Sequence, residues 1–119
     1  MKEGVKIISR VKSGELWFCS GCNAYHLMFN NLFFAFTKKE LIGFKNYVDK
    51  LEIGYWEHKY ACSNLRRKIP IPTSQENLVI MLNRQEVIEL QTLLAFKNAS
   101  IKAYKTLNAD DIDYECHLN

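Results

Sequence analysis

Apolar and polar positions follow the same order in two stretches of the chain, residues 31–48 (NLFFAFTKKELIGFKNYV) and residues 77–94 (NLVIMLNRQEVIELQTLL). Each stretch opens with five apolar residues in a row, at 32–36 and again at 78–82. Short runs of this kind, rich in branched and aromatic side chains, are typical of buried strands. The pattern therefore predicts one buried strand in each half of the chain, with the two copies 46 residues apart.

A helix start follows each of these predicted strands. Thr37 and Asn83 are N-cap residue types, whose side-chain oxygens accept hydrogen bonds from free backbone N–H groups. Glu40 and Glu86 stand three positions later, which completes the pattern of a capping box in each copy. Apolar residues then recur at spacings of three and four, which places them on one helical face: Leu41, Phe44 and Val48 in the first copy, and Val87, Leu90 and Leu94 in the second.

The segments upstream of the two copies also match, although less closely. The segment ELWFC precedes SGC in the first half, and EHKYAC precedes SN in the second. A further strand follows each, AYHLMF and RRKIPI. We therefore predict a single α+β domain over residues 1–119 with a duplicated β-β-β-α unit. The two repeats cover about residues 15–52 and 56–97, and an acidic C-terminal tail covers 108–119.

Both faces of the third strand in each repeat are apolar, which is typical of a strand in the middle of a covered sheet. The simplest arrangement pairs the two third strands about a pseudo-two-fold axis. The prediction is a six-stranded antiparallel sheet with two helices on one face. The other face of the sheet must also be covered. The candidates for this are the segment VKIISRV at 5–11, the tail, sheet curvature and a second copy of the chain. A homodimer is therefore one expected partner arrangement.

Composition narrows the class of protein. A chain of 119 residues with 48% apolar and 24% charged residues buries enough surface to fold without a metal or a disulfide. No apolar run approaches the roughly 20 residues of a membrane helix, and the first residues lack the features of a signal peptide. We therefore predict a cytoplasmic protein that does not enter a membrane, in which the four cysteines are thiols, ligands or redox groups.

The cysteines supply the first candidate chemistry. Cys19 and Cys22 form a Cys-x2-Cys pair at a strand–turn–strand corner, the arrangement in which two thiolates meet on one zinc ion. Zinc is thus the candidate cofactor, and the metal-ligand candidates are Cys19, Cys22, His26 and Cys62, with His58, Cys116 and His117 as further choices. The alternatives are small half-buried thiols, and a redox pair. The predicted sheet separates Cys19 from Cys62 by roughly 20 Å or more, which argues against one ion on both.

A small basic patch supplies the second candidate chemistry. The candidate nucleic-acid residues are Lys59, Arg66, Arg67 and Lys68, and Tyr55, Trp56 and Tyr60 lie close by in the sequence. Cations interleaved with aromatic rings are typical of nucleic-acid surfaces. The alternative is a sheet edge that charge protects from aggregation, and the low net charge of +3 favours this alternative. No phosphate-binding loop, dinucleotide motif or nucleophile elbow is present, so the sequence predicts no catalytic residues.

The segment CSGCNAYHLMFNNLFFAF at 19–36 resembles an uncharacterised family of small cytoplasmic bacterial proteins, a domain of unknown function. That family has a Cys-x2-Cys followed by an apolar hairpin. The match extends over about residues 15–96, with Asn30 where the family pattern has Gly. The resemblance implies a cytoplasmic bacterial protein of undetermined activity.

Three functions remain open from the sequence. The first is a non-enzymatic interaction or regulatory module that self-associates. The second is a zinc-binding, nucleic-acid-associated protein. The third is an enzyme with its site between the two halves, because such interfaces often form clefts.

Overall fold

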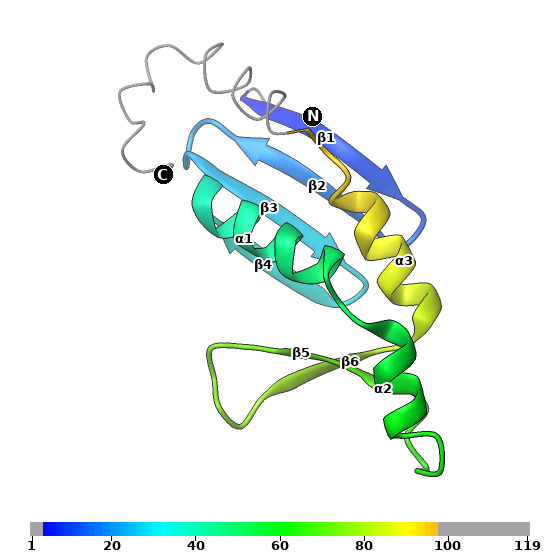
Figure 1. The fold of residues 1–119 in the computed structure, drawn as a ribbon. Coiled ribbons are helices and arrows are strands. Elements are labelled where there is room, and N and C mark those ends of the chain that lie inside the picture. Colours follow the sequence, from blue (N-terminus) through cyan, green and yellow to red (C-terminus); the bar gives the residue numbers. More distant parts are fainter. Residues whose placement is uncertain (1–3, 98–119) are drawn as a thin grey trace.

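The computed structural model describes residues 4–97, and within this range the chain is an α+β protein. Figure 1 shows helices packed in front of the larger sheet and a separate hairpin below it. In chain order the elements are β1 (Val5–Val11), β2 (Gly14–Cys19), β3 (Ala24–Phe29), β4 (Leu32–Phe36), α1 (Lys38–Asp49), α2 (Ile53–Lys59), β5 (Ile69–Pro72), β6 (Val79–Leu82) and α3 (Arg84–Leu93).

The four-stranded sheet is a simple antiparallel meander in the order β1-β2-β3-β4. Side chains along each strand point alternately to the two faces of the sheet, as expected for a period of two residues. Leu16 and Phe18 of β2 are buried on the helix side, and so are Tyr25, Leu27 and Phe29 of β3. The β3–β4 turn places Asn30 at φ 54°, a left-handed conformation that asparagine tolerates.

Helices α1 and α3 both cover the same face of this sheet, as the sequence predicts. The apolar stripes of the two helices form one core with the strands. The buried residues of the helices and of the α3 C-cap are Leu41, Val48, Val87, Leu90, Leu93 and Leu94. The two capping boxes are also confirmed. Thr37 Oγ1 accepts from the Glu40 N–H at 3.1 Å, and Asn83 Oδ1 accepts from the Glu86 N–H at 2.8 Å. In each half a hairpin is therefore followed by a helix, whereas the duplicated β-β-β-α unit is not confirmed.

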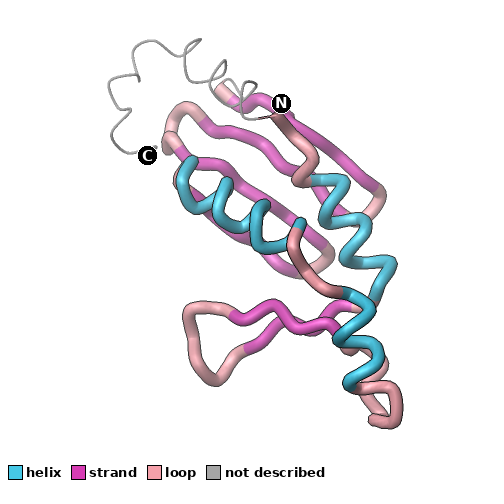
Figure 2. Tube along the Cα trace, in the orientation of Figure 1, coloured by secondary structure: helices cyan, strands magenta, loops and turns pink. Residues whose placement is uncertain are grey.

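The predicted six-stranded sheet is wrong. The strands β4 and β6 lie in different sheets, because β5 and β6 pair only with each other in a two-stranded sheet of their own. The pseudo-two-fold pairing of the third strands is therefore absent within residues 4–97. Figure 2 shows the hairpin below β4, connected to the rest of the molecule through α2 and α3.

The two copies diverge because of the segment before each hairpin. In the first copy this segment is strand β2, whereas in the second it is helix α2. Residues 57–62 therefore do not form the expected strand, since Ile53, Trp56 and Tyr60 recur at the helical spacings of three and four. Within the described residues the β5–β6 hairpin therefore has no third strand beside it.

Two further sequence predictions need correction. Residues 5–11 do not cover the second sheet face, because they join the sheet edge as β1. The run 32–36 is not buried on both faces, because Phe33 is 56% exposed on the face away from the helices. An edge strand with one covered face explains both observations. None of the described helices is long and apolar enough to cross a membrane.

Candidate metal centre

The register between β2 and β3 brings Cys19 and His26 onto one face of the sheet. Cys19 lies opposite Ala24, and Trp17 lies opposite His26. His26 is therefore two residues along β3 from the partner of Cys19, which makes the two side chains diagonal neighbours on the same face. This is the face that α1 and α3 leave uncovered, because Leu16 and Phe18 of β2 point to the helix side.

The four-residue connection between β2 and β3 carries the third member of the cluster. Asn23 adopts φ 53°, which turns the chain back into β3 and leaves Cys22 exposed at the corner. The Ser20 N–H donates to the Gly4 carbonyl at 2.9 Å. Gly4 has φ 83°, a left-handed conformation that favours glycine. The start of the chain thus holds the turn in place.

The ligand atoms of Cys19, Cys22 and His26 all lie within 4.8 Å of one another. Cys22 Sγ is 3.3 Å from His26 Nε2, and the Cys22 N–H donates to Cys19 Sγ at 3.4 Å. A tetrahedral zinc with Zn–S of about 2.3 Å and Zn–N of about 2.0 Å needs sulfurs about 3.8 Å apart, and sulfur and nitrogen about 3.5 Å apart. Small side-chain rotations would bring this cluster to that geometry.

Proton equilibria affect both the metal and the redox interpretation of the cluster. The hydrogen bond with Cys19, together with burial, raises the pKa of the Cys22 thiol. A raised pKa leaves little thiolate at neutral pH, which argues against a redox pair, and a metal that binds Cys22 must displace its proton. Burial lowers the pKa of His26, which keeps its imidazole neutral and able to bind a cation.

The His26 ring lies between two aromatic rings on the uncovered face. Its centroid is 5.5 Å from that of Trp17 and 5.4 Å from that of Phe33, on which it stacks at 11°. Its Nδ1 is buried and has no hydrogen-bond partner among the described residues. A metal on Nε2 would turn Nδ1 into a buried donor, and ligand histidines normally donate this proton to an acceptor. The described residues supply no such acceptor for Nδ1.

The structure does not bring the other predicted cysteine ligand to this cluster. Cys62 is exposed in the turn that follows α2, and α2 packs against β5. Cys116 and His117 lie outside the described residues. Sequence reasoning missed Trp17 and Phe33 as neighbours of the site, although the alternation of β2 and β4 already placed them on the face opposite the core.

The predicted nucleic-acid residues are partly occupied by contacts within the chain. Arg67 makes a bidentate ion pair with Glu86 at 2.8 Å, and Lys68 Nζ donates to the Leu65 carbonyl at 2.6 Å. The ion pair shifts the pKa of both partners. Arg67 lowers the pKa of Glu86, and Glu86 raises the pKa of Arg67. Arg66 is exposed. The nucleic-acid interface stays a prediction, and Glu86 weakens the positive field that it would need.

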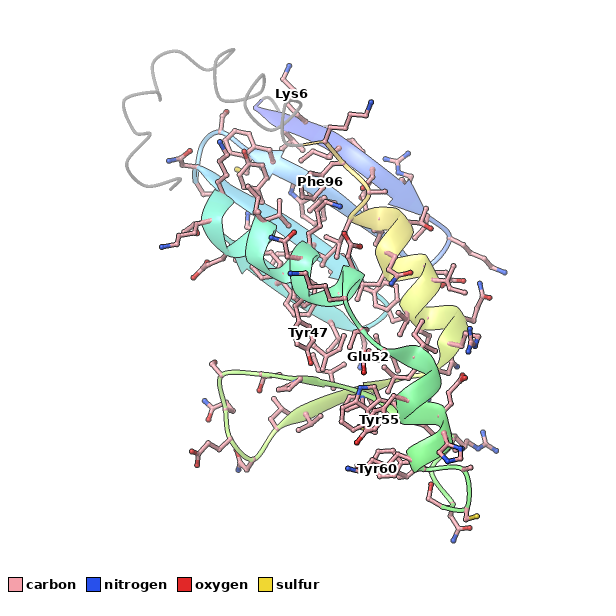
Figure 3. The ribbon with its side chains drawn as sticks, in the orientation of Figure 1. Lys6, Tyr47, Glu52, Tyr55, Tyr60 and Phe96 are labelled. Carbon is pink, nitrogen blue, oxygen red and sulfur yellow. The ribbon has the colours of Figure 1, made fainter. Side chains whose placement is uncertain are left out.

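Lys59 lies within a cluster of rings on α2. Its Nζ is 5.4 Å from the centroid of the Trp56 ring, 5.8 Å from that of Tyr60 and 5.9 Å from that of Tyr55. Figure 3 shows Tyr55 on α2 and Tyr60 at the end of that helix, beyond Tyr47 of α1 and Glu52 at the start of α2. The rings that would stack on bases therefore already contact a cation of their own helix.

The cleft between the two halves, which an enzyme would use, is a shallow hollow of about 490 Å³. Its lining comes from the β3–β4 turn, from β6 and from the Arg67–Glu86 ion pair. The charged groups in it neutralise each other, and the thiols and imidazole of the Cys19 cluster lie elsewhere. The described residues therefore offer their clearest chemistry at the β2–β3 corner.

Comparison with known proteins gives one result. No curated protein and no solved structure matches the chain significantly. A family model does match, and it covers residues 1–119. The resemblance seen around the Cys-x2-Cys and its apolar hairpin is thereby confirmed, and the chain belongs to the family of unknown function DUF6686.

Proposed function

We propose that this protein is a non-enzymatic regulatory module that binds one Zn²⁺ ion through Cys19, Cys22 and His26. The observation that supports this is the convergence of three ligand atoms within 4.8 Å at one corner of the sheet. Two thiols and an imidazole form a soft donor set, which suits zinc and does not suit magnesium or calcium. Zinc also carries no redox chemistry of its own.

The ion has a regulatory role because the core does not depend on it. The buried residues Leu16, Phe18, Tyr25 and Leu27 lie on the opposite face of the same strands and pack against the helices. A metal-free chain keeps these contacts, so it remains folded. Zinc adds stability only by mass action, since it binds the folded corner and not the unfolded chain.

Zinc binding alters the surface that a partner would meet. The ion holds the His26 ring, which contacts Trp17 and Phe33, and it displaces the thiol protons of Cys19 and Cys22. Phe33 and Met28 are 56% and 38% exposed on this face. Exposed apolar side chains next to a ligand site are typical of interaction surfaces. Self-association through this face stays a prediction, which light scattering over a concentration series tests.

Metal analysis of the purified full-length chain tests the proposal. We expect about one zinc ion per chain in the wild type. Cys22→Ser should lower the zinc affinity at least by the 10–100-fold that loss of a supporting contact costs in other sites. Cys62→Ser is the matched control, because it removes an exposed thiol away from the cluster. A wild-type chain that takes up no zinc on titration would contradict the proposal.

Tryptophan fluorescence gives a second readout at the site itself. Trp17 lies 5.5 Å from His26, whereas the other tryptophan, Trp56, lies on α2. In a Trp56→Phe background, Co²⁺ bound at the cluster should quench Trp17 strongly. The same background with His26→Ala should show weak quenching at equal Co²⁺. Equal quenching with and without His26 would place the ion elsewhere.

A further inference from the structure

The β5–β6 hairpin has one edge that is blocked by proline. Strands β5 and β6 pair only with each other, so each has an outer edge with no strand beside it in the described part of the chain. Proline has no N–H, so the ladder bonds from β5 to β6 come from Ile69 and Ile71. The nitrogens of Pro70 and Pro72 then face the outer edge of β5. That edge lacks two donors and is a poor template for a further strand.

The outer edge of β6, in contrast, keeps its backbone donors and acceptors. Ile80 lies opposite the second of these isoleucines, so its backbone groups face β5. The Leu78 carbonyl points to the same side, since it accepts from Thr73 Oγ1 at 2.8 Å. Because alternate residues of a strand face opposite edges, Val79 and Met81 turn their N–H and C=O groups to the outer edge of β6.

This open edge lies at the surface and is apolar. The shallow hollow of about 490 Å³ is lined by every residue from 78 to 82 and by no residue of β5, so it follows the outer edge of β6. Leu78 and Val79 are 53% and 45% exposed. Residues 78–82 include no proline and no charge, the features by which sheet edges avoid pairing. An edge of this kind is suited to the addition of another strand.

The sequence around β6 indicates which strand fits this edge. Residues 75–85 read QENLVIMLNRQ, in which glutamine, asparagine and apolar residues recur in reverse order on the two sides of Ile80. When two such strands pair antiparallel about Ile80, every residue lies opposite its counterpart. The charged counterparts are Glu76 and Arg84, which have opposite signs. The other counterparts are Gln75 and Gln85, Asn77 and Asn83, Leu78 and Leu82, and Val79 and Met81.

We propose that β6 pairs with β6 of a second copy of this chain, antiparallel and about a two-fold axis at Ile80. The hydrogen-bonding phase agrees with this register. Val79 lies opposite Met81 of the second copy, and both turn their N–H and C=O groups to the shared edge. The two hairpins then form one four-stranded sheet in the order β5-β6-β6-β5. This contact is separate from the zinc site at the β2–β3 corner and does not depend on it.

Opposite charges at both ends of the paired strands fix the register. Glu76 is exposed and makes no ion pair among the described residues. Arg84 is also exposed and pairs with Glu57 of its own chain at 2.7 Å, and its remaining N–H donors are available to a second carboxylate. In the dimer each Glu76 lies beside Arg84 of the other copy, so two complementary pairs flank the apolar strands. A shift of the strands along each other would separate both pairs.

The small size of the contact sets its strength. Strand β6 has four residues. Stable complexes use roughly 20–30 residues a side, so this contact forms a weak dimer. We expect a dissociation constant of about 0.1–1 mM, which leaves the dilute chain monomeric.

Sedimentation equilibrium of the full-length chain, with a chelator present, measures this association. Wild type should change from monomer to dimer between about 0.02 and 2 mM. Val79→Lys places a charge on the open edge and should raise the dissociation constant at least about tenfold. Ile88→Lys is the matched control and should leave the constant unchanged, because Ile88 is 43% exposed but lies on α3 and not on the strand edge.

A charge exchange tests the register itself. Glu76→Arg places two arginines side by side in the dimer, and Arg84→Glu places two glutamates side by side. Each variant alone should therefore dimerise about fivefold more weakly than wild type. A mixture of the two variants restores both opposite-charge pairs, so it should form mixed dimers of about wild-type strength.

Each result supports or overturns the proposal. A wild type that stays monomeric up to about 2 mM overturns it. A dimer that Phe33→Lys abolishes and Val79→Lys leaves intact also overturns it, because the contact then uses the uncovered face of the larger sheet. Charge variants that do not recover on mixing overturn the antiparallel register. Unchanged far-ultraviolet circular dichroism shows that the variants are folded, and an unchanged zinc affinity of Val79→Lys keeps this test independent of the zinc site.

Discussion

The hairpin–helix unit β3–β4–α1 and its counterpart β5–β6–α3 begin from similar residue types and end in different surroundings. The first hairpin belongs to a four-stranded sheet, whereas the second stands alone as two strands. Both helices carry a complete capping box, and Leu41 and Val48 of the first are buried like their counterparts Val87 and Leu94 in the second. The stripes differ at one further pair, because Tyr47 is exposed and its counterpart Leu93 is buried. Local signals thus act alike in the two halves, and the element before each hairpin decides whether the hairpin becomes part of a sheet.

The largest effect expected from this comparison is on core stability. Leu27 in β3 is fully buried, and the Leu27→Ala variant should lose about 2–5 kcal/mol of unfolding free energy in urea denaturation. Leu78, just before β6, is 53% exposed, and Leu78→Ala should stay within about 0.5 kcal/mol of wild type. Comparable losses at both sites would mean that the second hairpin is covered in solution.

Hydrogen exchange sharpens the same comparison. A two-stranded hairpin leaves both outer edges without strand partners, and such a sheet is marginal without further packing. The β5–β6 amides should exchange at least about tenfold faster than those of β3, which has a strand on either side. The buried Ile69 and Ile71 connect the hairpin to the core, so exchange should still be slower than in an unfolded peptide. Equal protection in β3 and β5 would show one cooperative unit.

The smallest effect concerns the two capping boxes. Arg67 pairs with Glu86 and lowers its pKa, whereas Glu40 caps an exposed helix end. Because the folded-state pKa of Glu86 is lowered, its stabilisation is present above the usual glutamate pKa and is lost as pH falls through the lowered value. Glu86→Gln should therefore cost up to about 1 kcal/mol at pH 7, and less in acid.

Thermal unfolding of Glu86→Gln and Glu40→Gln at pH 7 and in mild acid measures this difference. The cost at Glu40 should be smaller, because the part-buried Glu86 has the ion pair in addition to its cap. A cost for Glu86→Gln that does not depend on pH would remove the ion pair from the explanation.

The candidate site was largely visible in the sequence. The spacing of Cys19 and Cys22 marks a shared ligand corner, and the alternation of β3 places His26 on the same face once the turn length is known. Trp17 and Phe33 were not recognised, because their neighbours belong to different strands and depend on register. The sequence also argued against one ion on Cys19 and Cys62, but from a six-stranded sheet that the structure does not have. The structure supplies the actual reason, since the segment before Cys62 forms a helix and a turn where a strand was predicted.

The sequence alone predicted the apolar strand runs, the apolar stripes of the helices and both capping boxes. Each of these depends on side chains within four residues of one another. The tertiary structure decided which strands pair, which face stays uncovered and where Cys62 lies. These depend on contacts between distant segments, and the residues of the two hairpins themselves do not say whether a third strand will join them. The segment before the second hairpin forms helix α2, so no strand from it pairs with β5.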